Sequence, residues 1–174
     1  MRIAIILNPI EAVLDEAAKY MGVVEKPKLS NRGLEIDYWL SECKVPLGLP
    51  WCAAFVTNVL RQALGRGNPV YLTASVQTTV DWATSLGALG ILTDSPMKGD
   101  LFVLYFESLK RYGHIGFVKE VVDATTFKTI EGNSNSEGSR EGYGVVSNTR
   151  KVSKNTKFIR WINALGDSEK VRML

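Results

Sequence analysis

Apolar residues recur at helical spacing in the first half of the sequence, most clearly over residues 51–64. One stripe in this segment, at spacings of three and four, consists of Cys52, Phe55, Val56, Val59, Leu60 and Ala63. Pro50 stands just ahead of the segment and Gly65 follows it, as is common at the two ends of a helix. The pattern therefore predicts a helix over 51–64.

The remaining pattern changes from helical in the first half to strand-like in the second. Residues 11–21, 34–42 and 76–85 have helical spacing, and residues 44–50 contain two prolines and a glycine, which predicts a loop. We expect strands over 101–106, 114–122, 126–131, 144–148 and 157–162. Because helices come first, the expected fold class is α+β, with N-terminal helices packed on an antiparallel β-sheet.

Composition fits one globular domain, since the 174 residues are 45% hydrophobic and 22% charged. The net charge of +3 is a mild excess that would suit an anionic polymer such as a cell wall. Basic residues form no long run, which argues against nucleic acid as a partner. No apolar stretch is long enough for membrane insertion, and the run over 3–7 is too short for a signal peptide. We therefore expect synthesis in the cytoplasm without a signal peptide.

The two cysteines, Cys43 and Cys52, lie nine residues apart, and His114 is the single histidine. Two cysteines make no disulfide framework in a domain of this size. A zinc site normally takes four protein ligands, or three and a water, and this set does not fit one. We expect no metal and no cofactor. Cys43 is expected to be structural, because nothing near it in the sequence resembles a base.

Cys52 is the first candidate for chemistry, because it lies in the first turn of the predicted helix. Backbone N–H groups and the helix dipole at this end favour the thiolate, which is the reactive form of cysteine. Position alone supports a second interpretation equally well, since free cysteine is often a small buried core residue.

His114 is the second candidate, and it lies in the segment Tyr112-Gly113-His114-Ile115-Gly116-Phe117-Val118. Strand alternation places His114 and Gly116 on one face and Phe117 on the other. The glycines would leave open space around the imidazole, as a base that reaches a substrate needs. The alternative is a surface histidine on a strand.

Glu131 and Asn133 follow in the segment Thr129-Ile130-Glu131-Gly132-Asn133-Ser134-Asn135 and share one strand parity. A carboxylate or amide that accepts a hydrogen bond from the imidazole Nδ1–H would fix the tautomer and orientation of the ring. The same residues would also suit a strand that ends in a polar turn.

In this order the segments resemble the CHAP family, the cysteine, histidine-dependent amidohydrolases and peptidases of phage lysins and bacterial wall hydrolases. The resemblance rests on Pro50-Trp51-Cys52-Ala53-Ala54-Phe55-Val56, Lys98-Gly99-Asp100, Gly113-His114-Ile115-Gly116 and Glu131-Gly132-Asn133. It covers about residues 30–162, the expected core of a single CHAP-like catalytic domain over 1–174.

The resemblance implies a papain-like cysteine hydrolase that cleaves an amide bond of peptidoglycan. It assigns the nucleophile to Cys52, proton transfer to His114, orientation of the histidine to Glu131 and a positioning role to Asn133. The backbone N–H of Cys52 would contribute to the oxyanion hole.

Two aromatic residues, Trp51 and Tyr112, adjoin these candidates and are expected to bind substrate along the cleft.

The sequence does not decide which bond is cleaved, because an N-acetylmuramoyl-L-alanine amidase and an endopeptidase attack an amide carbonyl with the same thiolate. We favour a monomeric bacteriophage endolysin that acts on the wall after release. A secreted antibacterial toxin and a non-catalytic wall-associated or virion binding module are the alternatives. The absence of an acidic loop like the calcium site of some phage members argues against a metal.

Overall fold

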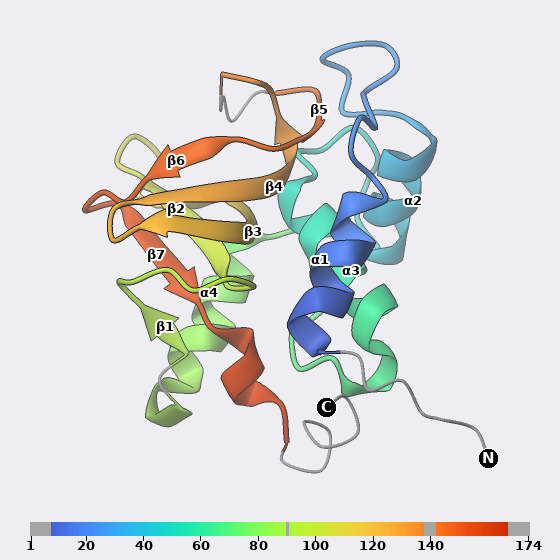
Figure 1. Ribbon diagram of the computed structural model, residues 1–174. Helices are drawn as coiled ribbons and strands as arrows, with labels where there is room; N and C mark the ends of the chain where they lie inside the picture. The colour runs from blue at the N-terminus through green and yellow to red at the C-terminus, as the bar shows by residue number, and fades with distance from the viewer. Residues whose placement is uncertain (1–7, 90, 138–141, 167–174) are drawn as a thin grey trace, which may run out of the picture.

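The structure, a computed structural model, describes residues 8–89, 91–137 and 142–166 (Figure 1). Its helices are α1 (Pro9–Ala18), α2 (Leu34–Glu42), α3 (Cys52–Leu64) and α4 (Val76–Ser85). Its strands are β1 (Leu92–Thr93), β2 (Leu101–Phe106), β3 (Arg111–Asp123), β4 (Thr126–Ser134), β5 (Gly144–Val146), β6 (Thr149–Lys151) and β7 (Thr156–Ile159). The helices precede the strands, as the apolar pattern predicts, and α2, α4 and β2 have the predicted bounds.

Within the described residues, the strands form one antiparallel sheet in the order β1-β7-β2-β3-β4-β5, and β6 pairs with the first residues of β4. Figure 1 shows the sheet on one side of the molecule and α1, α2 and α3 gathered on the other. This arrangement confirms the predicted α+β class, with N-terminal helices packed on an antiparallel sheet.

The sheet buries apolar side chains on both of its faces. Ile115 and Phe117 of β3 belong to the large core that the sheet shares with the helices. Val118 faces the opposite side, where a smaller core holds Phe102, Phe127 and Phe158. The alternation predicted for this strand is confirmed, and it gives β3 two buried faces.

Helix α3 is buried on almost every side, because its apolar stripe packs on β3 and β4. Part of its opposite, polar face is buried as well, since Thr57 and Asn58 have no exposed surface. The amide of Asn58 donates to the carbonyl of Trp39 at 3.1 Å, and Thr57 Oγ1 lies 2.9 Å from the carbonyl of Thr73. Burial of both faces fixes the position of the first residue of the helix, Cys52.

Strand β3 contains one irregularity near its start. The register pairs Leu104 with His114, Tyr105 with Tyr112 and Phe106 with Arg111. Gly113 is therefore an extra residue in β3, a β-bulge, and the side chains before it exchange faces. As a result Arg111 shares the face of His114, whereas Tyr112 lies on the other face.

Several predicted bounds were wrong where backbone contacts decide them. The helix predicted over 11–21 begins at Pro9, because the side chain of Asn8 accepts a hydrogen bond from Ile10 N at 2.9 Å, and it ends at Ala18. The strand predicted over 157–162 ends at Ile159 and gives way to the 3-10 turn Trp161–Ala164. Strands β1 and β6 were not predicted, since two or three residues carry no readable alternation. In the ranges that the structure describes, none of the helices combines the length and apolar character of a membrane span.

Gly132 lies where β4 passes beneath the start of α3. A Cβ at this position would lie 2.7 Å from the ring of Trp51 and 3.0 Å from that of Phe55. Gly132→Ala should therefore lower the free energy of unfolding by about 1–3 kcal/mol, the usual cost of overpacking. Urea denaturation measures this loss. Gly87→Ala is the matched control, because nothing lies within 4 Å of its added Cβ. Equal losses in the two variants would contradict the close approach.

Candidate active site

Cys52 is the first residue of α3 and opens onto a cleft of about 380 Å³. Its side chain is 6% exposed, and both it and Cys43 are free thiols. The N–H groups of the first helical turn have no intrahelical partner, so they point toward whatever occupies the cleft beside the sulfur. A nucleophile and hydrogen-bond donors for an oxyanion thus occur together at the start of α3.

His114 and Glu131 form a fully buried pair across neighbouring strands. The Nε2 atom of His114 lies 2.7 Å from Glu131 Oε2, and the side chains are 1% and 0% exposed. The pairing of Phe117 with Ile130 brings β3 and β4 into the register that this contact needs. Glu131 is therefore placed to orient His114, as was predicted.

The structure corrects which ring nitrogen takes part. The sequence suggested that Nδ1–H of His114 would donate to the carboxylate, but Glu131 is bonded to Nε2. Nδ1 is buried and has no conventional hydrogen-bond partner among the described residues. The Cys52 sulfur also raises the pKa of His114, so the thiol and the imidazole are neighbours in the site. Hydrogen bonds between catalytic groups often tighten only when a substrate binds.

The electrostatics of the pair favour a protonated histidine. Burial by itself would lower the pKa of His114, but the Cys52 sulfur and the Glu131 carboxylate outweigh it and raise the pKa from 6.5 to about 9. Burial would also raise the pKa of Glu131, yet hydrogen bonds from His114 and Arg150 hold this pKa well below its ordinary value. At neutral pH an imidazolium therefore lies between a carboxylate and a sulfur.

Arg150 of β6 is a member of the site that sequence reasoning missed. Its Nε donates to Glu131 Oε1 at 2.8 Å and a second nitrogen donates to Oε2 at 2.5 Å, while Thr129 Oγ1 donates to Oε1 at 2.6 Å. The guanidinium also lies over the ring of Phe102, 5.3 Å from its centroid. A two-point contact of this kind fixes both oxygens of the carboxylate. No sequence signal marked Arg150, because β6 is three residues long.

Asn133 lies at the end of β4 and holds the start of α3. Its Oδ1 accepts a hydrogen bond from the backbone N of Trp51 at 2.8 Å, and its Nδ2 donates to the carbonyl of Gly142 at 2.9 Å. The backbone at Asn133 is left-handed, with φ of 54°, a conformation that asparagine tolerates better than most residues. Asn133 thus contacts the residue before Cys52 rather than the imidazole, which gives the predicted positioning role a concrete form.

Trp51 does not reach the cleft, so its predicted contact with substrate is wrong. Its side chain has no exposed surface and packs against Trp39 in the core. Its indole N–H donates to the buried carboxylate of Glu25 at 2.9 Å, and the other oxygen of Glu25 accepts from the backbone N of Asn31 at 3.0 Å. Trp51 therefore anchors the start of α3 to the loop after α1.

Open space around the His114 ring was predicted from the glycines beside it, and this prediction is wrong. A Cβ on Gly116 would lie 2.6 Å from the ring of Phe102 and 2.8 Å from Glu131 Cβ. The missing side chain instead lets Phe102 and Glu131 come close to β3, and His114 packs against Phe102 with ring centroids 5.8 Å apart. Gly116 is therefore needed for the contact between His114 and Glu131.

Tyr112 was also predicted to line the cleft, and the structure does not bring it there. The bulge at Gly113 turns Tyr112 to the helix-facing side, where it packs against the large core and makes an edge contact with Tyr105. The residues of β3 that line the cleft are Arg111 and Gly113. Strand alternation read from sequence could not show this exchange, because a bulge leaves no pattern of its own.

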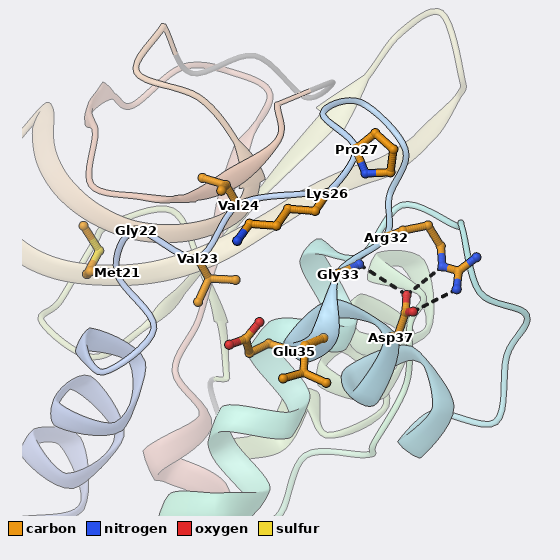
Figure 2. A pocket seen from close by; sticks show the side chains of 11 residues that line it. Met21, Gly22, Val23, Val24, Lys26, Pro27, Arg32, Gly33, Glu35 and Asp37 are labelled. Carbon is orange, nitrogen blue, oxygen red and sulfur yellow. Dashed lines mark hydrogen bonds and ion pairs between the residues drawn. The ribbon is translucent and has the colours of Figure 1, made fainter.

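A larger hollow, of about 870 Å³, lies between the loop after α1 and the start of α2 (Figure 2). The guanidinium of Arg32 in its lining binds both oxygens of Asp37. Figure 2 shows Asp37 bonded to Gly33 N as well. The hollow is lined by neither a cysteine nor a histidine, and it lacks the set of groups that surrounds Cys52.

Comparison with known proteins assigns the family. The sequence matches the CHAP domain over residues 44–133, a range that includes Cys52, His114, Glu131 and Asn133. The chain belongs to the CHAP family. One similar solved structure is titled the crystal structure of Ly7917. The similarity covers 86% of this chain and 61% of that chain, with 17% sequence identity and a TM-score of 0.47. A search of curated proteins finds no match.

The α+β architecture agrees with membership of the CHAP family. A cysteine at the start of a helix that packs on an antiparallel sheet is the papain-like arrangement, as the resemblance predicted. The family implies an amidase or peptidase that hydrolyses the cell wall. Among the described residues, no group of three or more histidine, cysteine or acidic side chains could hold a metal ion.

The pKa of His114 predicts the alkaline limit of activity in this CHAP domain. The rate of sacculus digestion should hold at neutral pH and fall as pH rises through about 9, where the imidazolium loses its proton. Glu131→Gln should move this fall to lower pH, because the carboxylate is one of the groups that raise the pKa of His114. Unchanged alkaline limits of activity in the variant would contradict this coupling.

The raised pKa of His114 also links protein stability to pH. The stability that the ion pair contributes is complete below pH 6.5 and is lost as pH rises through about 9.

Arg150 should act as a positioning residue through Glu131. Arg150→Met should lower kcat about ten- to a hundredfold with little change in KM, since a lost charge-assisted bidentate contact is worth about 1.5–3 kcal/mol. It should also move the acidic limit of activity to higher pH, because Arg150 lowers the pKa of Glu131. Arg61→Met, which removes a pairing with Glu42 away from the cleft, is the control. A purely structural role would lower stability and leave the acidic limit in place.

Proposed function

We propose that this protein is a peptidoglycan hydrolase that cleaves an amide bond with Cys52 as its nucleophile. The observation that carries the proposal is the buried series of Cys52, His114 and Glu131, in which the pKa of His114 is raised by its two neighbours. This series is what acyl transfer by a thiolate requires, namely a nucleophile, a proton carrier and a group that orients the carrier.

In the proposed reaction the Cys52 sulfur attacks the carbonyl carbon of the scissile amide. The negative charge that develops on the oxygen is stabilised by the free N–H of Cys52 in the first turn of α3, a contact typically worth about 3 kcal/mol. His114 then donates the proton on Nδ1 to the leaving amine nitrogen as the C–N bond breaks. A water molecule then gives a proton to the same nitrogen and attacks the thioester carbonyl, which releases the carboxylic acid and the Cys52 thiolate and restores the imidazolium.

Each neighbour of the pair has a task in this scheme. Glu131 stabilises the imidazolium, and Arg150 keeps Glu131 ionised and in place. Asn133 holds Trp51 N, so that the N–H of the next residue, Cys52, stays aimed into the cleft. The same groups would serve either an N-acetylmuramoyl-L-alanine amidase or an endopeptidase, because both reactions attack an amide carbonyl.

The setting we propose is lysis of a bacterial wall by a phage endolysin that acts as a monomer after release from the cytoplasm. The support is the resemblance of the motifs around Cys52, His114 and Glu131 to those of phage lysins. A holin gene beside this one is the expected context. An adjacent immunity gene would point instead to an antibacterial toxin with the same chemistry.

Digestion of purified sacculi, followed by mass spectrometry of the new termini, tests the proposal. Cys52→Ser should lose cutting by roughly a thousandfold or more, as loss of a nucleophile usually does. Cys43→Ser is the matched control and should keep full activity, since Cys43 lies beside Asn58 and burial raises the pKa of its thiol. New amino termini at L-alanine identify an amidase, and termini within the peptides identify an endopeptidase. Binding to sacculi without cutting would show a non-catalytic module, and full activity in Cys52→Ser would exclude this nucleophile.

A further inference from the structure

The cleft beside Cys52 contains one strong charge among the described residues that line it. That charge is the exposed guanidinium of Arg111, at the start of β3. The other lining side chains are neutral, and they include Asn31, Leu49, Ser75, Val76, Leu109 and Asn133. A single cation among apolar and amide groups selects for one anionic group on whatever enters the cleft.

The β-bulge directs Arg111 toward the reactive pair. Without the extra residue Gly113, strand alternation would put Arg111 on the face opposite His114. With the bulge, Arg111 pairs with Phe106 and shares the face on which His114 pairs with Leu104. Bulges often re-aim a side chain beside an active site.

Arg111 has no carboxylate partner among the described residues, a property that it shares with Arg66 just after the end of α3. A carboxylate pairs with each of Arg32, Arg61, Arg150 and Arg160. Within the described residues no acidic side chain pairs with Arg111, although Glu107 lies only four positions earlier in the same turn. Its guanidinium is therefore available for a ligand, and it can bind a carboxylate through two parallel hydrogen bonds.

We infer that Arg111 forms a subsite for a carboxylate of the peptidoglycan stem peptide, an inference that rests on the function proposed above. Three residues of strand span about 10 Å, so Arg111 lies about that far from His114 along β3. A carboxylate held there belongs to a residue next to the scissile amide rather than to the amide itself. Stem peptides carry such groups on D-glutamate and on diaminopimelate, and in many walls one or the other is amidated.

Paired synthetic muramoyl peptides test the subsite. One pair differs only in a carboxylate or a carboxamide at the glutamate α-position, and a second pair differs in the same way at diaminopimelate. Wild-type protein should cleave the acid of one pair about tenfold more efficiently than its amide, through KM, as expected for a charge-assisted contact. Arg111→Gln should bring that ratio to about one by losing efficiency on the acid alone. The pair that shows the effect identifies which carboxylate is bound.

Lys110→Gln is the matched control, because it removes a neighbouring positive charge that does not line the cleft. It should keep the preference for the acid. Rising salt should weaken the preference of the wild type, since the guanidinium is exposed. Two measurements check that Arg111→Gln keeps its fold and its site. Its thermal unfolding midpoint should equal that of the wild type, and iodoacetamide should still alkylate Cys52.

The outcomes separate the subsite from the proposed function. Equal cleavage of acid and amide by the wild type, or an unchanged preference in Arg111→Gln, would overturn the subsite and leave the hydrolase in place. Loss of the preference in Lys110→Gln as well would show general attraction by positive charge and would also overturn it. A wild type that cleaves neither member of either pair nor sacculi would overturn the hydrolase and the subsite together.

Discussion

The buried ion pair between His114 and Glu131 is the interaction on which the rest of the site depends. Charges without exposed surface are tolerated only when paired and hydrogen-bonded, because burial disfavours the charged form of each group. Here the carboxylate meets a histidine, an arginine and a threonine hydroxyl, and the imidazole meets a carboxylate and a sulfur. The local sequence serves this contact, since Gly116 lets β3 and β4 approach and Arg150 supplies the second cation.

The second constraint is the fixed start of α3. Gly132 allows β4 to pass against the rings of Trp51 and Phe55, and Asn133, next along β4, holds the backbone N of Trp51. The indole of Trp51 is in turn bonded to Glu25. Helix and sheet are thus joined at one crossing, immediately before Cys52. Because backbone and indole are both held, the sulfur and the first-turn N–H groups keep a constant relation to the imidazole, as acyl transfer requires.

The candidate site could be predicted only in part, and the errors share a cause. Cys52, His114 and Glu131 have residue types and motifs that point to their chemistry, whereas Arg150 lies in a three-residue strand without a motif. Trp51 and Tyr112 were expected in the cleft because they adjoin reactive residues. Adjacency in sequence does not fix direction in space, and one side chain points into the core while the bulge turns the other away. Arg111 takes the place in the cleft that Tyr112 was expected to fill.

The sequence by itself determined the fold class, the order of the elements and the motifs of the CHAP family, since apolar periodicity and residue type are local properties that survive without coordinates. Tertiary structure decided which imidazole nitrogen meets Glu131, which residue holds the carboxylate and which side chain of β3 faces the cleft. These depend on register, a bulge and the packing of one helix on a sheet. Each is set by contacts between segments far apart in the chain, so no local pattern records them.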